Sequence, residues 1–108
     1  MFKIIGNTIN ITRGDTGLFT LNITDGSGQP YDYSSDTVIF TVKSNVYTTD
    51  HLIQKTVRYG EIVTIQPEDT SSLCYGVYWY DVQVTTQSGI VDTVITPSKF
   101  IVRTEVTF

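Results

Sequence analysis

The sequence predicts an all-β protein, in which about seven or eight short strands form an antiparallel β-sandwich or a small barrel. Apolar and polar residues alternate along most of the chain, as they do in strands with one buried face. Turns that contain glycine separate these stretches at intervals of about 8–12 residues. No stretch shows the longer apolar repeat of an amphipathic helix.

The alternating stretches give the strand candidates and the turns between them. In chain order, the candidates are Phe2–Ile5, Thr8–Thr12, Thr16–Thr24, Thr37–Ser44, Leu52–Val57, Ile62–Ile65, Val77–Thr86 and, on either side of Pro97, Ile90–Thr96 and Lys99–Val106. Asp25-Gly26-Ser27-Gly28 predicts a turn, because glycine reaches positive φ without steric cost. The candidates over residues 52–57 and 62–65 predict a hairpin across Arg58-Tyr59-Gly60.

The alternation breaks between residues 67 and 73. Pro67 favours the start of a single helical turn, and Glu68 and Asp69 are favourable at its N-terminus. In many immunoglobulin-type sandwiches, a turn crosses between the sheets just before a tyrosine whose hydroxyl bonds back to the turn backbone. Leu73 and Tyr78 have a spacing that suits such a corner. The alternative is that Tyr78 is an ordinary core aromatic.

The same alternation divides the strand residues between a buried and an exposed face. The predicted core consists of Phe19, Leu21, Ile23, Val38, Phe40, Val42, Val63, Ile65, Tyr78, Tyr80, Val82, Val84 and Phe100. Burying side chains of this kind stabilises a fold by roughly 1.5–3 kcal/mol each in transfer terms, most of which offsets chain entropy.

Composition and charge exclude several classes of partner. The formal net charge is -4 and the seven Lys and Arg residues are scattered, so no basic surface for nucleic acid is expected. No apolar run approaches the roughly 18 residues of a membrane span, and the N-terminus does not resemble a signal peptide. Synthesis and folding in a reducing cytoplasm are expected. Cys74 is the single cysteine, which rules out an internal disulfide, and we expect it to be a small buried hydrophobe.

Isolated motifs in the chain have simpler structural interpretations. Arg13-Gly14-Asp15 matches an integrin-binding tripeptide but is accounted for by a turn. Asn10-Ile11-Thr12 and Asn22-Ile23-Thr24 match the glycosylation pattern and are interpreted as strand residues. His51 is the single histidine and is expected in a solvated loop. No nucleophile–base pair, metal set or phosphate-binding loop is visible, so we predict a protein that is not an enzyme and has no cofactor.

Trp79 is the residue that points most directly to an interaction surface. Its predicted strand face also carries Val77 and polar residues, which directs the indole toward solvent. The expected neighbouring strand, residues 37–44, offers Ile39 on the same side. An apolar patch of Val77, Trp79 and Ile39 would mark a subunit contact. The alternative is that a terminal segment covers Trp79 or that the face assignment is wrong.

A series of short motifs resembles a recurring pattern in small phage and prophage proteins of Gram-positive hosts. The motifs are Ile11-Thr12-Arg13-Gly14-Asp15-Thr16, Asp25-Gly26, Gly28-Gln29-Pro30-Tyr31-Asp32, Val38-Ile39-Phe40-Thr41-Val42-Lys43, Leu52-Ile53-Gln54-Lys55, Ile65-Gln66-Pro67-Glu68-Asp69-Thr70, Tyr75-Gly76-Val77-Tyr78-Trp79-Tyr80-Asp81-Val82-Gln83 and Lys99-Phe100-Ile101-Val102. Their order is similar to that in the immunoglobulin-like N-terminal domain of phage upper-baseplate and related virion proteins.

The resemblance implies one immunoglobulin-like antiparallel β-sandwich domain over residues 1–108. It implies a non-enzymatic structural module of a phage or prophage particle, in the tail and baseplate or on the head, made in the bacterial host cytoplasm. Its partners would be other phage structural proteins, and a homo-oligomer is compatible with this role. In the baseplate family the domain leads into longer regions, whereas this sequence ends at Phe108. A stand-alone virion protein and one domain of a longer chain therefore both stay open.

The alternative function is a carbohydrate-binding β-sandwich module for host cell-wall or surface glycans. The seven tyrosines and Trp79 suggest it, because sugar sites often use exposed flat aromatics that are flanked by polar groups.

Overall fold

A computed structural model of the chain describes residues 1–24 and 27–104. In these residues, the strands and the single helical turn are β1 (Phe2–Ile5), β2 (Thr8–Thr12), β3 (Gly17–Thr20), β4 (Thr37–Lys43), β5 (Ile53–Val57), β6 (Ile62–Ile65), α1 (Pro67–Thr70), β7 (Gly76–Thr85) and β8 (Val91–Arg103). The prediction of an all-β fold is confirmed.

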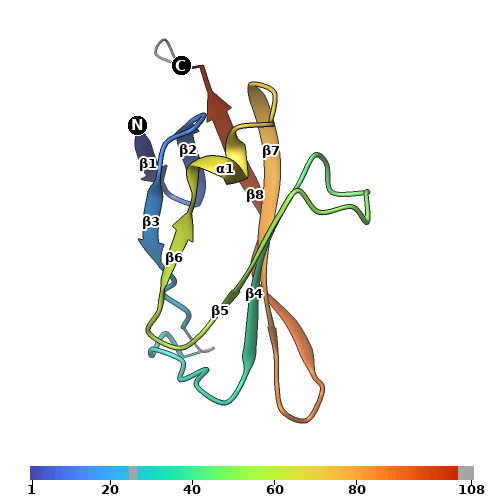
Figure 1. The fold of residues 1–108 in the computed structure, drawn as a ribbon. Coiled ribbons are helices and arrows are strands. Elements are labelled where there is room, and N and C mark those ends of the chain that lie inside the picture. The colour runs from blue at the N-terminus through green and yellow to red at the C-terminus, as the bar shows by residue number, and fades with distance from the viewer. Residues whose placement is uncertain (25–26, 105–108) are drawn as a thin grey trace.

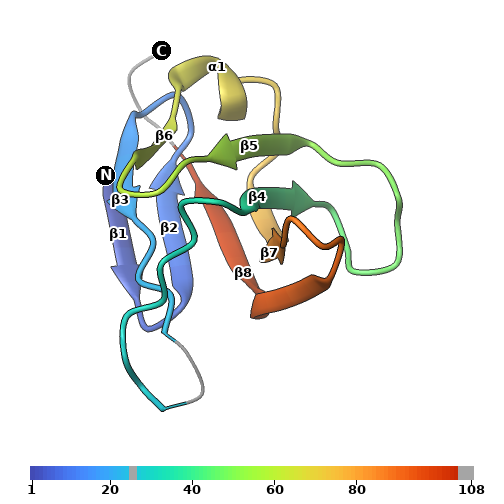
Figure 2. The same ribbon diagram turned by 90° about the horizontal axis from the view of Figure 1, so that it is seen from below.

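The strands form two sheets, ordered β1-β2-β8-β7-β4-β5 in the larger and β3-β6 in the smaller. The larger sheet curls, and the β3–β6 pair faces its concave side (Figures 1 and 2). Neighbouring strands are antiparallel except for β2 and β8, which are parallel. The larger sheet is therefore mixed, not purely antiparallel as expected. The β1–β2 hairpin docks against the last strand, and local alternation does not specify such a pairing between distant segments.

The N-terminal strands lie where the alternation predicts them. β1 and β2 are joined by a turn in which Gly6 has φ +57°, a conformation that residues with a side chain rarely adopt. β3 is shorter than predicted, because its partner β6 begins at Ile62, opposite Thr20. Asp25 and Gly26 of the predicted turn, and the end of the last predicted strand at Val106, lie outside the described residues.

The predicted hairpin of residues 52–57 and 62–65 is wrong. β5 pairs with β4 in the larger sheet, whereas β6 pairs with β3 in the smaller sheet. The turn itself forms: the Glu61 N–H donates to the Arg58 carbonyl (3.0 Å), and Gly60 has φ +77°. The chain crosses between the sheets at this turn. Val57 of β5 and Val63 of β6 are both buried, and each reaches the core from a different sheet.

β8 continues through Pro97, although the sequence places this proline between two predicted strands. From Tyr80 to Val82 on β7, the partner on β8 changes from Ser98 to Ile95, so β8 holds one extra residue there. At a β-bulge the extra residue is left out of the hydrogen-bond ladder between the strands. Proline, which has no N–H to donate, is therefore tolerated at this point of β8.

The crossing from β6 to β7 is made by α1 and the turn after it. The Gln66 N–H donates to Asp69 Oδ2 (2.7 Å), which closes the start of the helical turn. Further along, the Tyr78 hydroxyl donates to the Cys74 carbonyl (2.7 Å), which confirms the predicted back-bond to the turn. Leu73 is buried, but Cys74 is exposed, so the prediction of a buried cysteine is wrong. The turn directs these neighbouring side chains to opposite sides.

The core lies between the two sheets, with Phe40 at its centre. The Phe40 ring is fully buried, and its centroid lies 5.6 Å from that of Phe19 and 5.3 Å from that of Tyr80. Most of the predicted core is buried, whereas Phe19, Leu21 and Tyr78 are half-buried and pack against its edge. Buried apolar residues that were not predicted are Ile9, Ile11, Tyr33, Ile53, Val57, Leu73 and Val102.

We expect Phe40→Ala to lower the free energy of unfolding by about 3–5 kcal/mol, because it removes a ring that contacts both sheets and leaves a cavity. Urea denaturation followed by circular dichroism measures this change. Ile39→Ala, on the half-buried outer face of the same strand, should cost clearly less. A Phe40→Ala protein as stable as the wild type would contradict this core.

Tyr78→Phe should lower the free energy of unfolding by about 0.5–1.5 kcal/mol, because it removes the hydrogen bond to the Cys74 carbonyl and leaves the packing of the ring unchanged. The matched control is Tyr75→Phe, since Tyr75 is exposed in the same turn. Equal effects of the two substitutions would show that the back-bond does not stabilise the corner.

Candidate functional site

The outer face of β7 carries Val77 and Trp79, two of the three predicted interaction residues. Val77, Trp79 and Asp81 alternate with inward-facing residues, so their side chains lie on the outside of the larger sheet. In cross-strand register, Trp79 lies opposite Lys43 of β4 and Lys99 of β8. The predicted face assignment and the predicted neighbour of this strand are both confirmed.

The three predicted interaction residues do not form one patch. Val77 is 48% exposed and lies on the same face as Trp79, two residues away, with Ile101 of β8 opposite it. Ile39 lies opposite Gln83, four residues along β7 from Trp79, or about 13 Å. Trp79 itself is half-buried. On this face of the sheet, Trp79 therefore lies near Val77 and Ile101, whereas Ile39 lies too far away to belong to the same patch.

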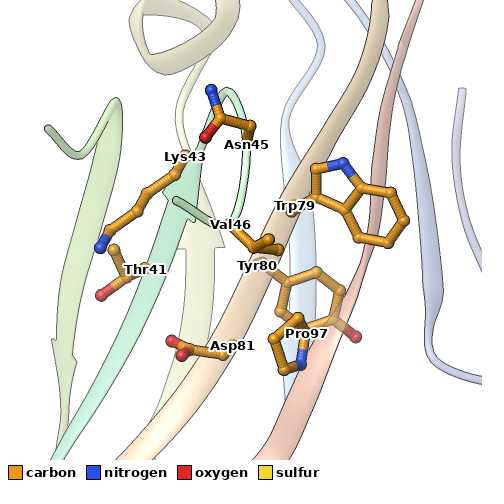
Figure 3. A pocket seen from close by; sticks show the side chains of 8 residues that line it. All are labelled: Thr41, Lys43, Asn45, Val46, Trp79, Tyr80, Asp81 and Pro97. Carbon is orange, nitrogen blue, oxygen red and sulfur yellow. The ribbon is translucent and has the colours of Figure 1, made fainter. Parts of the chain in front are cut away.

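A small hollow opens beside the indole of Trp79 (Figure 3). Its volume is about 60 Å³. This is room for a few water molecules, but pockets for drug-sized ligands span roughly 300–1,000 Å³. Trp79 and Pro97 form one side, and Lys43 and Thr41 form the other (Figure 3). The lining residues are Thr41, Lys43, Asn45, Val46, Trp79, Tyr80, Asp81 and Pro97.

The loop between β4 and β5 forms one rim of this hollow through Val46. Asn45 Oδ1 accepts hydrogen bonds from the backbone N–H groups of Tyr47 (2.9 Å) and Thr48 (3.0 Å), which fold the loop into a compact turn. Tyr47 is held in this turn with 91% of its surface exposed. No residue of this loop was among the predicted interaction residues. Asn45 is a turn signal, but no local signal places the turn beside Trp79.

Asp81 supplies the acidic group of the hollow. Burial raises the pKa of this carboxyl, and the nearby charge of Lys43 acts in the opposite direction and lowers it. The pair therefore presents an acceptor and a donor whose charges partly compensate each other. Such a pair suits hydrogen bonding to a neutral polar group or to a charged residue of a partner.

The Arg13-Gly14-Asp15 segment forms a turn that is anchored within the fold. The Gly14 N–H donates to Oγ1 of the fully buried Thr70 (2.9 Å). The Arg13 guanidinium lies 4.5 Å from the centroid of the Tyr75 ring, within cation–π range. The turn interpretation accounts for both contacts.

Three other residues that the motifs singled out, Asn10, His51 and Asp69, either make contacts within the fold or lie in an exposed loop. Asn10 is buried, and its Oδ1 accepts hydrogen bonds from Nε (3.2 Å) and Nη2 (2.8 Å) of Arg103. His51 lies exposed in the loop after β4, as predicted. Asp69 caps α1 and forms an ion pair with Lys55 (2.8 Å), in agreement with its interpretation as a residue of the helix start.

Across residues 1–24 and 27–104, no group of three or more His, Cys, Asp or Glu side chains is placed to hold a metal ion. The same residues form no helix of the length and hydropathy needed to cross a membrane. Neither a protein-family model nor a curated protein matches the chain.

Asp81→Asn tests the electrostatics of the hollow. Because the pKa of Asp81 is raised on folding, the folded chain binds this proton more tightly than the unfolded chain. This tighter proton binding stabilises the folded state at low pH, and the stabilisation is lost as the pH rises through the pKa of Asp81 in the folded chain. Asp81→Asn should therefore raise the free energy of unfolding more at pH 7 than at pH 3, as measured by urea titration. Exposed Asp92→Asn is the control, and a larger gain at pH 3 would contradict this assignment.

Proposed function

We propose that this chain is a non-enzymatic binding module that uses the outer face of its larger sheet, around Trp79, to contact another protein subunit. The observation that carries the proposal is the position of the indole. It is half-buried beside exposed Val77, and it lines a hollow together with Val46 of the loop that presents Tyr47. Tryptophan and tyrosine dominate the energetics of protein interfaces, because they bury large areas and lose little conformational freedom.

We further propose that the fold is an immunoglobulin-like sandwich. The run β8-β7-β4-β5 has the order of the G, F, C and C′ strands of that fold, and β3-β6 has the order of B and E. The Tyr78 hydroxyl bond lies at the crossing where that fold carries its tyrosine corner. The β1–β2 hairpin, which pairs with β8, is the element that a minimal sandwich of this type does not require.

The particle in which the module works is inferred from the motif resemblance to phage virion proteins. On this basis we propose a structural module of a phage or prophage particle, in the tail and baseplate or on the head. Other structural proteins of the particle would be its partners, and the virion would be its final location. The aromatic centre of this outer face is surrounded by the charged side chains of Lys43, Lys99 and Asp81, and a partner subunit would pair with these charges at the rim of the contact.

The second candidate is glycan binding at the same face. The hollow combines an indole with Thr41, Asp81 and Lys43, which supply hydrogen-bond donors and acceptors beside an apolar plane. A sugar ring would lie across the hollow of about 60 Å³, not inside it. This arrangement favours a weak glycan contact as the runner-up.

Trp79→Ala should reduce the amount of the chain in purified phage particles, measured by quantitative mass spectrometry, and should leave thermal unfolding cooperative. Truncation of a central interface tryptophan typically costs about 2 kcal/mol or more of binding free energy. Gln83→Ala is the matched control, because it lies exposed on the same strand face. Absence of the wild-type chain from the particles would refute the proposal.

The single tryptophan also separates the two candidates directly. Titration with host cell-wall polysaccharide should leave the intrinsic fluorescence unchanged if the face binds protein. A saturable shift that Asp81→Asn weakens would favour the glycan module instead.

A further inference from the structure

The smaller sheet has an unpaired edge along β3. In the described residues, β3 pairs only with β6, and β1 pairs with β2 in the other sheet. In an antiparallel strand, alternate residues direct their N–H and C=O groups away from the partner. From Leu18 onward, the side of β3 opposite β6 therefore presents backbone donors and acceptors that no other strand of the described chain uses, whereas Gly17 is buried and lies against the Phe2 ring of β1.

This edge continues beyond the end of β3. Phe19, Leu21 and Ile23 keep the inward alternation, although β6 no longer accompanies the chain after Thr20. The next backbone contact is the hydrogen bond from the Tyr31 N–H to the Ile23 carbonyl (2.8 Å), where Thr24 also bridges to the following loop.

Hollows lie on both sides of this segment. One of about 280 Å³ separates it from the β1–β2 turn and is lined by Ile4, Phe19 and Leu21 among others. Another of about 490 Å³ separates it from the turn after β5 and is lined by Tyr31 and Tyr59 among others. The inner side of the segment is thus apolar and incompletely covered.

The edge also lacks the devices that usually prevent strands from associating. From Gly17 to Thr24 the sequence contains no charged residue and no proline. By contrast, β1 carries Lys3 and β5 carries Lys55. Charged side chains and proline are the common means by which natural proteins block an exposed strand edge. On the outer side of the smaller sheet, Leu18 and Ile62 are each 58% exposed.

We infer that the β3 edge is the contact through which two copies of this chain associate. The two β3 strands would pair antiparallel about a two-fold axis and form one continuous sheet in the order β6-β3-β3-β6. A second copy fits because such a contact is self-complementary: each strand meets the same pattern of donors and acceptors that it presents. The segment itself carries no charge, so no like charges meet across the paired strands, and the net charge of -4 on each copy opposes association only at longer range.

Sedimentation equilibrium of the full chain over micromolar to millimolar concentrations tests this inference. We expect a monomer–dimer equilibrium that Thr20→Lys weakens by about tenfold or more, because the exposed Thr20 side chains of two copies would lie near the axis. Gln54→Lys is the matched control, since it adds the same charge to the free edge of the larger sheet. It should leave the dissociation constant unchanged, as should Trp79→Ala.

Amide hydrogen exchange supplies a second measurement. Protection in residues 19–22 should rise with protein concentration in the wild type but not in Thr20→Lys. A chain that stays monomeric throughout, or a dimer that Thr20→Lys does not weaken, overturns the inference. A dimer that Trp79→Ala disrupts would place self-association on the outer face instead. The experiment can therefore refute the proposed β3 contact without refuting the proposed Trp79 contact.

Discussion

The contact of Phe40 with the rings of Phe19 and Tyr80 is the interaction on which the rest of the structure depends. Phe19 belongs to the smaller sheet, whereas Phe40 and Tyr80 lie on adjacent strands of the larger one. The three aromatic rings hold the layers together without a disulfide. Since the inward residues of β4 and β7 are committed to this contact, the outward residues of the same strands are available for binding.

The positions of the candidate site residues follow from this division of faces. Trp79 points outward because Tyr78 and Tyr80, on either side of it, point inward. The bulge at Pro97 brings the proline ring to the hollow beside the indole, and the turn organised by Asn45 brings Val46 to its rim. Neither neighbour belongs to the regular part of a strand. The shape of the candidate site is therefore produced by the irregularities of the sheet.

The two proposed contacts use different physical features of the fold. The Trp79 face offers side chains: an indole, exposed apolar residues and a partly buried acid–base pair. The β3 edge offers backbone groups, because the N-terminal strand pairs with β2 rather than with β3. A module with one contact of each kind can associate with its own copy and with a different subunit at the same time.

The amino-acid sequence by itself determined the strand content, the inward faces of β4 and β7 and the helical turn at Pro67, and it offered the corner bond of Tyr78 as one of two alternatives. Each of these depends on neighbours within a few residues, so alternation and turn chemistry are sufficient to predict them. Only the tertiary structure decided that β5 and β6 belong to different sheets, that β2 lies parallel to β8, and that Ile39 is remote from Trp79 while Val46 is near. Strand pairing and register are set by packing between segments that lie far apart in the chain. Local periodicity contains no information about which of these segments become neighbours.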